Sequence, residues 1–520
     1  MSLARDVTTV GTATLLSRLL GFFRDVGIAA VLGAGALSDA YFAALQIPNL
    51  FRRLLAEGAL NSAFVPTWLR IREQEGVAGT QRFAELVLGT MLVGLGAVAI
   101  VCLIFAPGVV HVLAPGFRPG GERFAFAVDF VRLSIAYVAI AGPIAVAASM
   151  LNAEGRVGAA AFALVAFNLV FVVVVGLVIL LGGRASFFAG AVLSLAIVAA
   201  GIAQLTLVGA ALMRQQGRPG RISLRLTPEV RRFFAQAIPG VVAGGIPQLK
   251  LMAGAMVASS SQASVSWLYY ANRLYELPLG VVAIAVASVI VPVIAASVRA
   301  GHVEAIAAAQ SRAFEIALGL ALPSAAAFAV LAEPLAGGLF ERGAFGPHDT
   351  AMVAAALAAI SAGLPGHVLE KVLGAVSFAH EDTRTPMAAA LCGLAAAIAG
   401  AMILFPIEGH VGVAAAIALS GWVGATTLAI VLWRRGWLAI DREARRRVPR
   451  IVLASVLMAA AIFGGHHFIA SALHGADSAL ARIATLMVLV AVGLGVYLAA
   501  VQALGIAGLK QLREAMRARI

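Results

Sequence analysis

Four arginines lie inside long apolar stretches of the chain, where a positive charge is costly and therefore informative. They are Arg18, Arg24, Arg52 and Arg273. An ionised side chain at mid-bilayer costs about 2.5–3.5 kcal/mol on insertion scales, so it normally faces a cavity or a partner. A guanidinium stays charged at any working pH and donates two parallel hydrogen bonds, a geometry that suits phosphate. These residues therefore predict a cationic, water-filled site for an anion, such as one that carries phosphates.

Acidic residues in the same region leave a second interpretation open. Asp25, Asp39, Glu57 and Glu276 could neutralise the arginines or take part in gating, because buried ions are usually paired. Arg18 and Asp25, seven residues apart, could share one helix face. The sequence does not decide between a cationic cavity and a set of separate ion pairs.

The composition indicates the elements that must position these charges. Hydrophobic residues make up 61% of the chain, charged residues only 12%, and the mean hydropathy is +0.97, whereas a soluble domain carries about a quarter charged residues. The apolar stretches are continuous, as in residues 164–181, rather than the alternating segments of a membrane barrel. The chain is therefore expected to be an all-α integral membrane protein, and its 54 glycines allow close helix packing in lipid.

A helix that crosses the hydrocarbon core needs about 20 residues, and fourteen stretches of the sequence meet this requirement. Counting from their outer ends at about 1.5 Å per residue places Arg18 and Arg52 roughly 22 Å deep, and Arg24 and Arg273 roughly 14 Å deep. The predicted spans are 6–33, 37–69, 83–110, 125–151, 158–181, 186–213, 229–258, 264–297, 310–331, 349–378, 385–405, 411–433, 449–468 and 481–504.

The basic residues between these spans predict the orientation of the chain. Segments on the side of the N-terminus hold 25 Lys and Arg, and the opposite segments hold 5, so the positive-inside rule places both termini in the cytoplasm. The net charge of +13 is thus a topology signal, and no nucleic-acid partner is expected. The two most basic loops divide the chain into residues 1–213 with helices 1–6, 214–435 with helices 7–12, and 436–520 with helices 13–14 and a cytoplasmic tail.

Distinctive motifs occur in both halves of the chain. The first half contains SRLLGFFRD at 17–25, SDAYFAALQIPNLFRRLLAEGA at 38–59 and FVP at 64–66. The second half contains SVSWLYYANRLYELPLGV at 264–281 and EDTRTP at 381–386. These motifs, in this order, resemble the MurJ (MviN) family of bacterial lipid II flippases. The resemblance covers nearly the whole chain, including the helix count.

The resemblance implies two six-helix lobes around a central cavity that opens alternately to each side of the bacterial cytoplasmic membrane. It also implies that lipid II, an undecaprenyl-diphosphate-linked peptidoglycan precursor, moves from the inner to the outer leaflet, with its tail in a groove of helices 13 and 14. By resemblance, the four arginines are essential cavity residues and Asp39 is functionally sensitive. One departure is Asn272, where relatives can carry Asp before the arginine, which puts a local counter-ion for Arg273 in doubt.

Other functions remain open from the sequence. A related exporter of drugs or other polyprenyl-linked sugars would share the fold, whereas a membrane enzyme acting on polyprenyl phosphates, a scaffold or a channel would belong to another class. We expect no enzyme activity, no catalytic residue, no metal and no cofactor, because neither a clustered acidic or histidine motif nor a phosphate-binding Gly-Lys loop occurs. The expected partners are lipid II and membrane lipids, and the energy would come from the membrane potential or from a monovalent ion.

Overall fold

A computed structural model describes residues 3–56, 59–216, 227–286, 290–301, 303–472 and 479–506. Helices joined by turns make up these residues, which contain no strand, so the predicted all-α class is confirmed. The chain forms two compact units. Unit 1 comprises residues 1–266 with 342–346, and unit 2 comprises 267–341 with 347–520. The predicted division at 213/214 and 435/436 stays a prediction.

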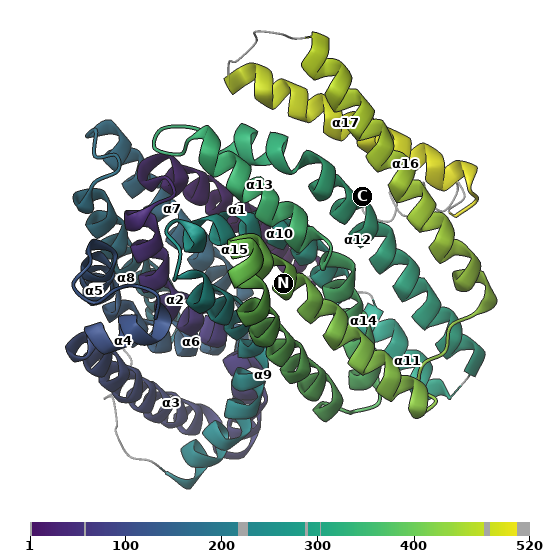
Figure 1. Ribbon diagram of the computed structural model, residues 1–520. Helices are drawn as coiled ribbons and strands as arrows, with labels where there is room; N and C mark the ends of the chain where they lie inside the picture. The colour runs from purple at the N-terminus through teal and green to yellow at the C-terminus, as the bar shows by residue number, and fades with distance from the viewer. Residues whose placement is uncertain are drawn as a thin grey trace. The chain divides into compact units, whose positions relative to one another are not determined.

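Unit 1 contains nine helices and the first turn of a tenth in its described part (Figure 1). The strongest packing joins α1 to α7, α3 to α6, and α7 to α8, while α9 packs against α2 and α3. The helices are α1 (Leu3–Leu32), α2 (Ala36–Ala56), α3 (Ala59–Ile104), α4 (Ala106–Leu113), α5 (Glu122–Ser134), α6 (Ala136–Ala153), α7 (Val157–Leu180), α8 (Phe187–Gln216) and α9 (Pro228–Ala258).

Unit 2 contains the remaining helices. The largest packing surfaces join α14 to α15 and α12 to both α13 and α16, and α16 and α17 lie side by side (Figure 1). The helices are α10 (Ser264–Ala285), α11 (Val291–Ala300), α12 (Val303–Phe340), α13 (Pro347–Ser361), α14 (Leu364–Ala379), α15 (Arg384–Arg434), α16 (Arg442–Ala472) and α17 (Ala479–Ala503).

The two longest helices change direction at glycines rather than at the prolines that they contain. Gly76 in α3 and Gly409 in α15 have φ of 70° and 56°, a left-handed backbone that glycine adopts without steric penalty. Each of these long elements is therefore two helices, in agreement with the predicted ends of spans near 69 and 405. Pro48 and Pro66 lie within continuous helix.

The predicted span count can be compared with helix length and composition. Among the described residues, eight helices are long and apolar enough to cross a membrane, and the bent pair α13 and α14 makes a ninth if it forms one span. The described helices fall within or close to the fourteen predicted ranges, but several ranges contain two shorter helices, as 125–151 does with α5 and α6. The count of fourteen crossings stays a prediction.

Small residues and aromatic rings together form the core of unit 1. A Cβ at Gly190 of α8 would lie 2.3 Å from the ring of Phe130 of α5, so only glycine allows this approach. Phe64 of the FVP motif stacks on Trp68 and contacts Phe233 of α9 at 6.0 Å between ring centroids. Aromatic packing thus holds α9 against α3.

Candidate functional site

Arg24 is held at the contact between α1 and α7. Its Nε and Nη2 donate to Oδ1 of Asp25 at 2.9 and 2.8 Å, and its Nη1 donates to Oδ1 of Asn168 at 3.2 Å. The guanidinium also lies 5.4 Å from the ring centroid of Phe171, and the side chain is only 13% exposed. Arg24 and Asp25, neighbours in sequence, therefore form an ion pair, whereas a pairing of Asp25 with Arg18 stays a prediction.

Asn168 is the residue that orients this arginine. Its Nδ2 donates to the carbonyl and hydroxyl oxygens of Ser17 at 3.0 and 3.1 Å and to the carbonyl oxygen of Leu164 at 3.2 Å. The amide thus binds α1 at two places, through Ser17 and through Arg24. Asn168 was not among the predicted site residues, although an amide in the apolar run 164–181 was a usable signal.

Arg52 of α2, like Arg24 of α1, lies over an aromatic ring of α7. Its guanidinium is 5.8 Å from the ring centroid of Phe167, and the rings of Phe167 and Phe171 are 5.3 Å apart. The structure thus brings Arg24 and Arg52 to neighbouring rings of one helix, where cation–π attraction favours both charges. Arg18 lies on α1, partly buried, about 9 Å before Arg24 along the helix axis.

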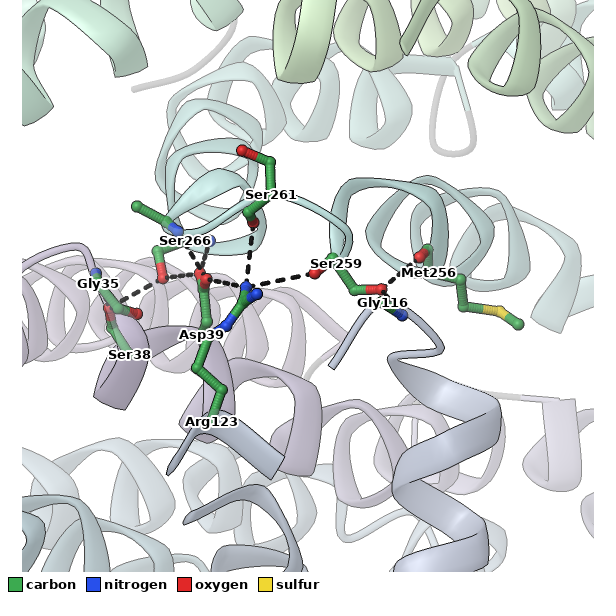
Figure 2. A network of polar contacts seen from close by, with 10 residues as sticks. Gly35, Ser38, Asp39, Gly116, Arg123, Met256, Ser259, Ser261 and Ser266 are labelled. Carbon is green, nitrogen blue, oxygen red and sulfur yellow. Dashed lines mark hydrogen bonds and ion pairs between the residues drawn. The ribbon is translucent and has the colours of Figure 1, made fainter. Parts of the chain in front are cut away.

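Asp39 forms a second polar centre in unit 1, at the start of α2 (Figure 2). Its carboxylate is fully buried and accepts hydrogen bonds from the backbone N–H of Ala263 at 2.7 Å and of Ser266 at 3.0 Å. The Ser266 hydroxyl adds a bond of 2.7 Å, and Arg123 lies 3.6 Å away as an ion-pair partner. Asp39 therefore caps the N-terminus of α10, where a negative charge is favourable.

Arg123 extends this network from Asp39 to the turn that joins α9 and α10. It donates to the carbonyl oxygens of Ser259 and Ser261 at 3.3 and 3.2 Å, as Figure 2 shows. The Ser259 hydroxyl accepts from the backbone N–H of Gly116 at 2.8 Å. In the sequence Arg123 is one of the five basic residues of the outer segments, whereas in the structure it connects α2, α5 and the α9–α10 turn.

Arg273 belongs to unit 2, on α10. Its Nη1 lies 3.4 Å from Oε2 of Glu276, one turn further along the helix, and both side chains are about one-fifth exposed. A carboxylate on the same helix thus provides the counter-ion that Asn272 does not. Glu57, the remaining predicted acid, lies outside the described residues.

The EDTRTP turn before α15 is an ordered polar junction of unit 2. Asp382 accepts hydrogen bonds from the backbone N–H of Arg384 and Thr385 and from the Thr385 hydroxyl, and it forms an ion pair with Arg435. Burial opposes ionisation of this carboxyl, but the bonds from Thr385, Arg435 and Arg384 outweigh it and lower the pKa of Asp382 to about 2. The motif thus ties the start of α15 to the segment after its end.

Comparison with solved structures gives the fold. The fold is that of the MOP-superfamily transporters: an inward-facing multidrug resistance MATE family transporter of that superfamily matches with a TM-score of 0.67 and 17% identity, covering 84% of this chain and 95% of that one. A lipid II flippase MurJ in an inward closed conformation matches with a TM-score of 0.78 and 22% identity, covering 94% and 97%.

Sequence comparison gives the family. The family model described as lipid II flippase MurJ matches residues 28–481. A probable lipid II flippase MurJ of Rhizobium meliloti (strain 1021) is 40% identical over 519 residues, which cover 99% of this chain and 97% of the relative. The lipid II flippase MurJ of Burkholderia cenocepacia is 31% identical, covering 84% and 85%. The chain belongs to the lipid II flippase MurJ family, as its motifs indicated.

Proposed function

We propose that this chain moves lipid II from the inner to the outer leaflet of the bacterial cytoplasmic membrane by alternating access. The observation that carries the proposal is the pairing of family membership over nearly the full chain with Arg24 and Arg52 held at neighbouring rings of α7. A polar headgroup needs a protein environment to replace its hydration in the bilayer, while the polyprenyl tail remains in lipid. Both termini are proposed to be cytoplasmic, as the loop charges predict.

The four arginines are proposed to bind the diphosphate of the substrate. Arg24 and Arg273 each have a carboxylate partner in the structure, and an arginine fork fits a phosphate as well as a carboxylate. On substrate binding, Arg24 would then exchange the Asp25 carboxylate, or Arg273 the Glu276 carboxylate, for a phosphate oxygen. Transport requires that binding differ between conformations, so these exchanges are expected to occur in only one of the two states.

The Asp39 network is proposed to act as a latch at the start of α10. The hydroxyl oxygens of Ser38 and Ser266 lie 2.9 Å apart, so cysteines at both positions can be joined by an oxidant once Cys102 and Cys392 are replaced by serine. Cross-linking is expected to stop translocation, and reduction to restore it. Continued translocation by fully cross-linked protein would exclude the latch.

The function is tested by depleting the protein from its host and measuring externally accessible and total lipid II. Accessible lipid II is expected to fall while total lipid II accumulates. Expression of the wild-type chain is expected to restore the accessible lipid II, whereas expression of R24A, R52A or R273A is not. The matched control is Arg132→Ala, because Arg132 also pairs with an acid three residues away, Asp129 at 3.7 Å, but is about half exposed. Unchanged accessibility in a host without another flippase would refute the proposal.

The energy source is proposed to be the membrane potential or a monovalent ion. An inside-negative potential favours outward movement of an anion by about 2.3 kcal/mol per charge per 100 mV. Imposing a potential on proteoliposomes that contain lipid II is expected to raise the outward rate, and collapse of the potential to lower it.

A further inference from the structure

Unit 2 contains a histidine in the interior of its helix packing that the anion site does not use. His367 lies on α14, near the midpoint of the predicted span 349–378, and is partly buried. A titratable side chain at this depth is expensive unless it has partners, and it marks an ion or proton pathway by default. The contacts of the ring decide what it can do.

Both nitrogens of the His367 ring have hydrogen-bond partners. Nδ1 lies 2.7 Å from the hydroxyl of Tyr275 of α10 and 3.1 Å from the carbonyl oxygen of Gly363. Nε2 lies 3.4 Å from the hydroxyl of Ser420 of α15, which itself donates to the carbonyl oxygen of Ile417 at 2.7 Å. Since the Ser420 hydrogen is used in that bond, the Ser420 oxygen is available to accept a hydrogen bond from the tautomer that carries a hydrogen on Nε2.

The Nδ1 position accommodates two protonation states. In the neutral ring, Nδ1 is an acceptor and the Tyr275 hydroxyl donates to it. In the protonated ring, Nδ1–H donates to the Gly363 carbonyl, and the Tyr275 oxygen becomes a second acceptor. Tyr275 can switch role because a hydroxyl both donates and accepts, and it is 3% exposed, so the switch occurs away from solvent. The contacts therefore support His367 both with and without the extra proton.

A carboxylate and two glycines complete the site. A Cβ at Gly421 would lie 2.6 Å from Nδ1 of His367, and a Cβ at Gly424 would lie 2.7 Å from the carboxyl carbon of Glu370. The ring and the carboxylate, one turn apart on α14, thus lie against a glycine face of α15, and Glu370 also acts electrostatically on Tyr275. The other charged residues on α10 and α14 are Arg273, Glu276 and Lys371. The helices α11, α12 and α15 also pack against α14, and their charged or titratable residues are Arg299, Glu304, Arg312, Glu315, Glu333, Arg384, Cys392, Glu408, His410 and Arg434.

We propose that His367 is a proton-binding site of unit 2, with Tyr275 as its switching hydrogen-bond partner and Glu370 as its counter-charge, and that its protonation is coupled to transport. The coupling rests on the proposed function, whereas the proton site itself does not. The proton passes between His367 and water without any change in covalent bonding elsewhere. A single coupled proton changes the equilibrium ratio of lipid II between the two leaflets by up to about tenfold per unit of pH gradient, since one unit corresponds to 1.36 kcal/mol.

The coupling is tested in proteoliposomes that contain lipid II, with a pH gradient imposed at constant membrane potential. Wild-type protein is expected to respond to the gradient, and His367→Gln and Tyr275→Phe to lose that response while retaining the response to potential. The matched control is His380→Gln, because His380 ends the same helix and its Nδ1 also bonds a carbonyl four residues back, Val376 at 2.9 Å. Equal pH-gradient responses of wild type and His367→Gln would overturn the coupling.

The proton site is tested separately by NMR of protein labelled with ¹⁵N-histidine. The His367 ring nitrogens, assigned by their loss in His367→Gln, are expected to titrate, and Tyr275→Phe to shift the midpoint. A ring that keeps one state from pH 5 to 9 would overturn the site, even if lipid II is transported. Absence of lipid II transport by wild type under every gradient would instead refute the proposed function and leave the titration result standing.

Discussion

Replacement of Asn168 by leucine tests whether one amide positions the arginine of the proposed anion site. The two Nδ2 hydrogens of Asn168 serve three acceptors, and its Oδ1 accepts from Arg24. Leucine has the same branched shape as asparagine, with larger methyl groups that suit the apolar surroundings of α7, but it can make none of these bonds. The substitution therefore removes the polar contacts that Asn168 makes between α1 and α7, while an apolar side chain still packs at this position.

The magnitude follows from the bonds that are lost. Interhelical hydrogen bonds in membrane proteins average about 0.6 kcal/mol and reach about 1.7, and those to charged groups are worth about 1.5–3 kcal/mol. The contact with Ser17 and the charged contact with Arg24 together predict a loss of about 2–3 kcal/mol of stability. Arg24 retains Asp25 but loses the partner that fixes its direction, so translocation is expected to fall at least tenfold.

The assay compares N168L with Asn152→Leu. Asn152 of α6 donates one neutral amide bond to Asn61 of α3 at 3.3 Å, so its replacement is expected to lose about 0.6 kcal/mol and to retain translocation. Stability is measured by unfolding in detergent, and function by externally accessible lipid II in depleted cells. Equal stability loss in the two variants, with normal translocation by both, would refute the role assigned to Asn168.

Three further predictions concern residues outside this contact. Asp39→Asn removes the charge that binds two backbone N–H groups, so about 1.5–3 kcal/mol of stability is expected to be lost in detergent unfolding, and an unchanged unfolding curve would contradict the buried cap. Asp382→Asn weakens the bond to Arg435. Because the pKa of Asp382 is lowered to about 2, the stability that this carboxylate contributes is present above about pH 4 and is lost as the pH falls toward 2. The free energies of unfolding of the variant and the wild type should therefore become equal only near pH 2. Gly190→Ala places a methyl group against the ring of Phe130 and is expected to lower stability by about 1–3 kcal/mol. Thermal unfolding checks this result, with Gly176→Ala as the control because a Cβ at Gly176 meets nothing within 4 Å.

The sequence by itself determined the class of the protein and most of the candidate residues. Burial of apolar surface and the cost of a charge in lipid act residue by residue, so an apolar run or an arginine inside it can be recognised without knowing its neighbours. Arg24, Arg52 and Asp39 were predicted in this way and lie in partly or fully buried polar contacts. The family motifs added the function, and the comparisons agree with it.

Only the tertiary structure decided which partners these residues have. A hydrogen bond needs particular atoms within about 3 Å of one another, and the residues concerned come from segments far apart in the sequence, such as Arg24 and Asn168, or Asp39 and Ser266. Arg123 illustrates the limit, because a charge in a short loop satisfies the topology rule whether or not it also binds a buried acid. The same holds for His367, whose chemistry depends on hydroxyls that α10 and α15 bring to its two ring nitrogens.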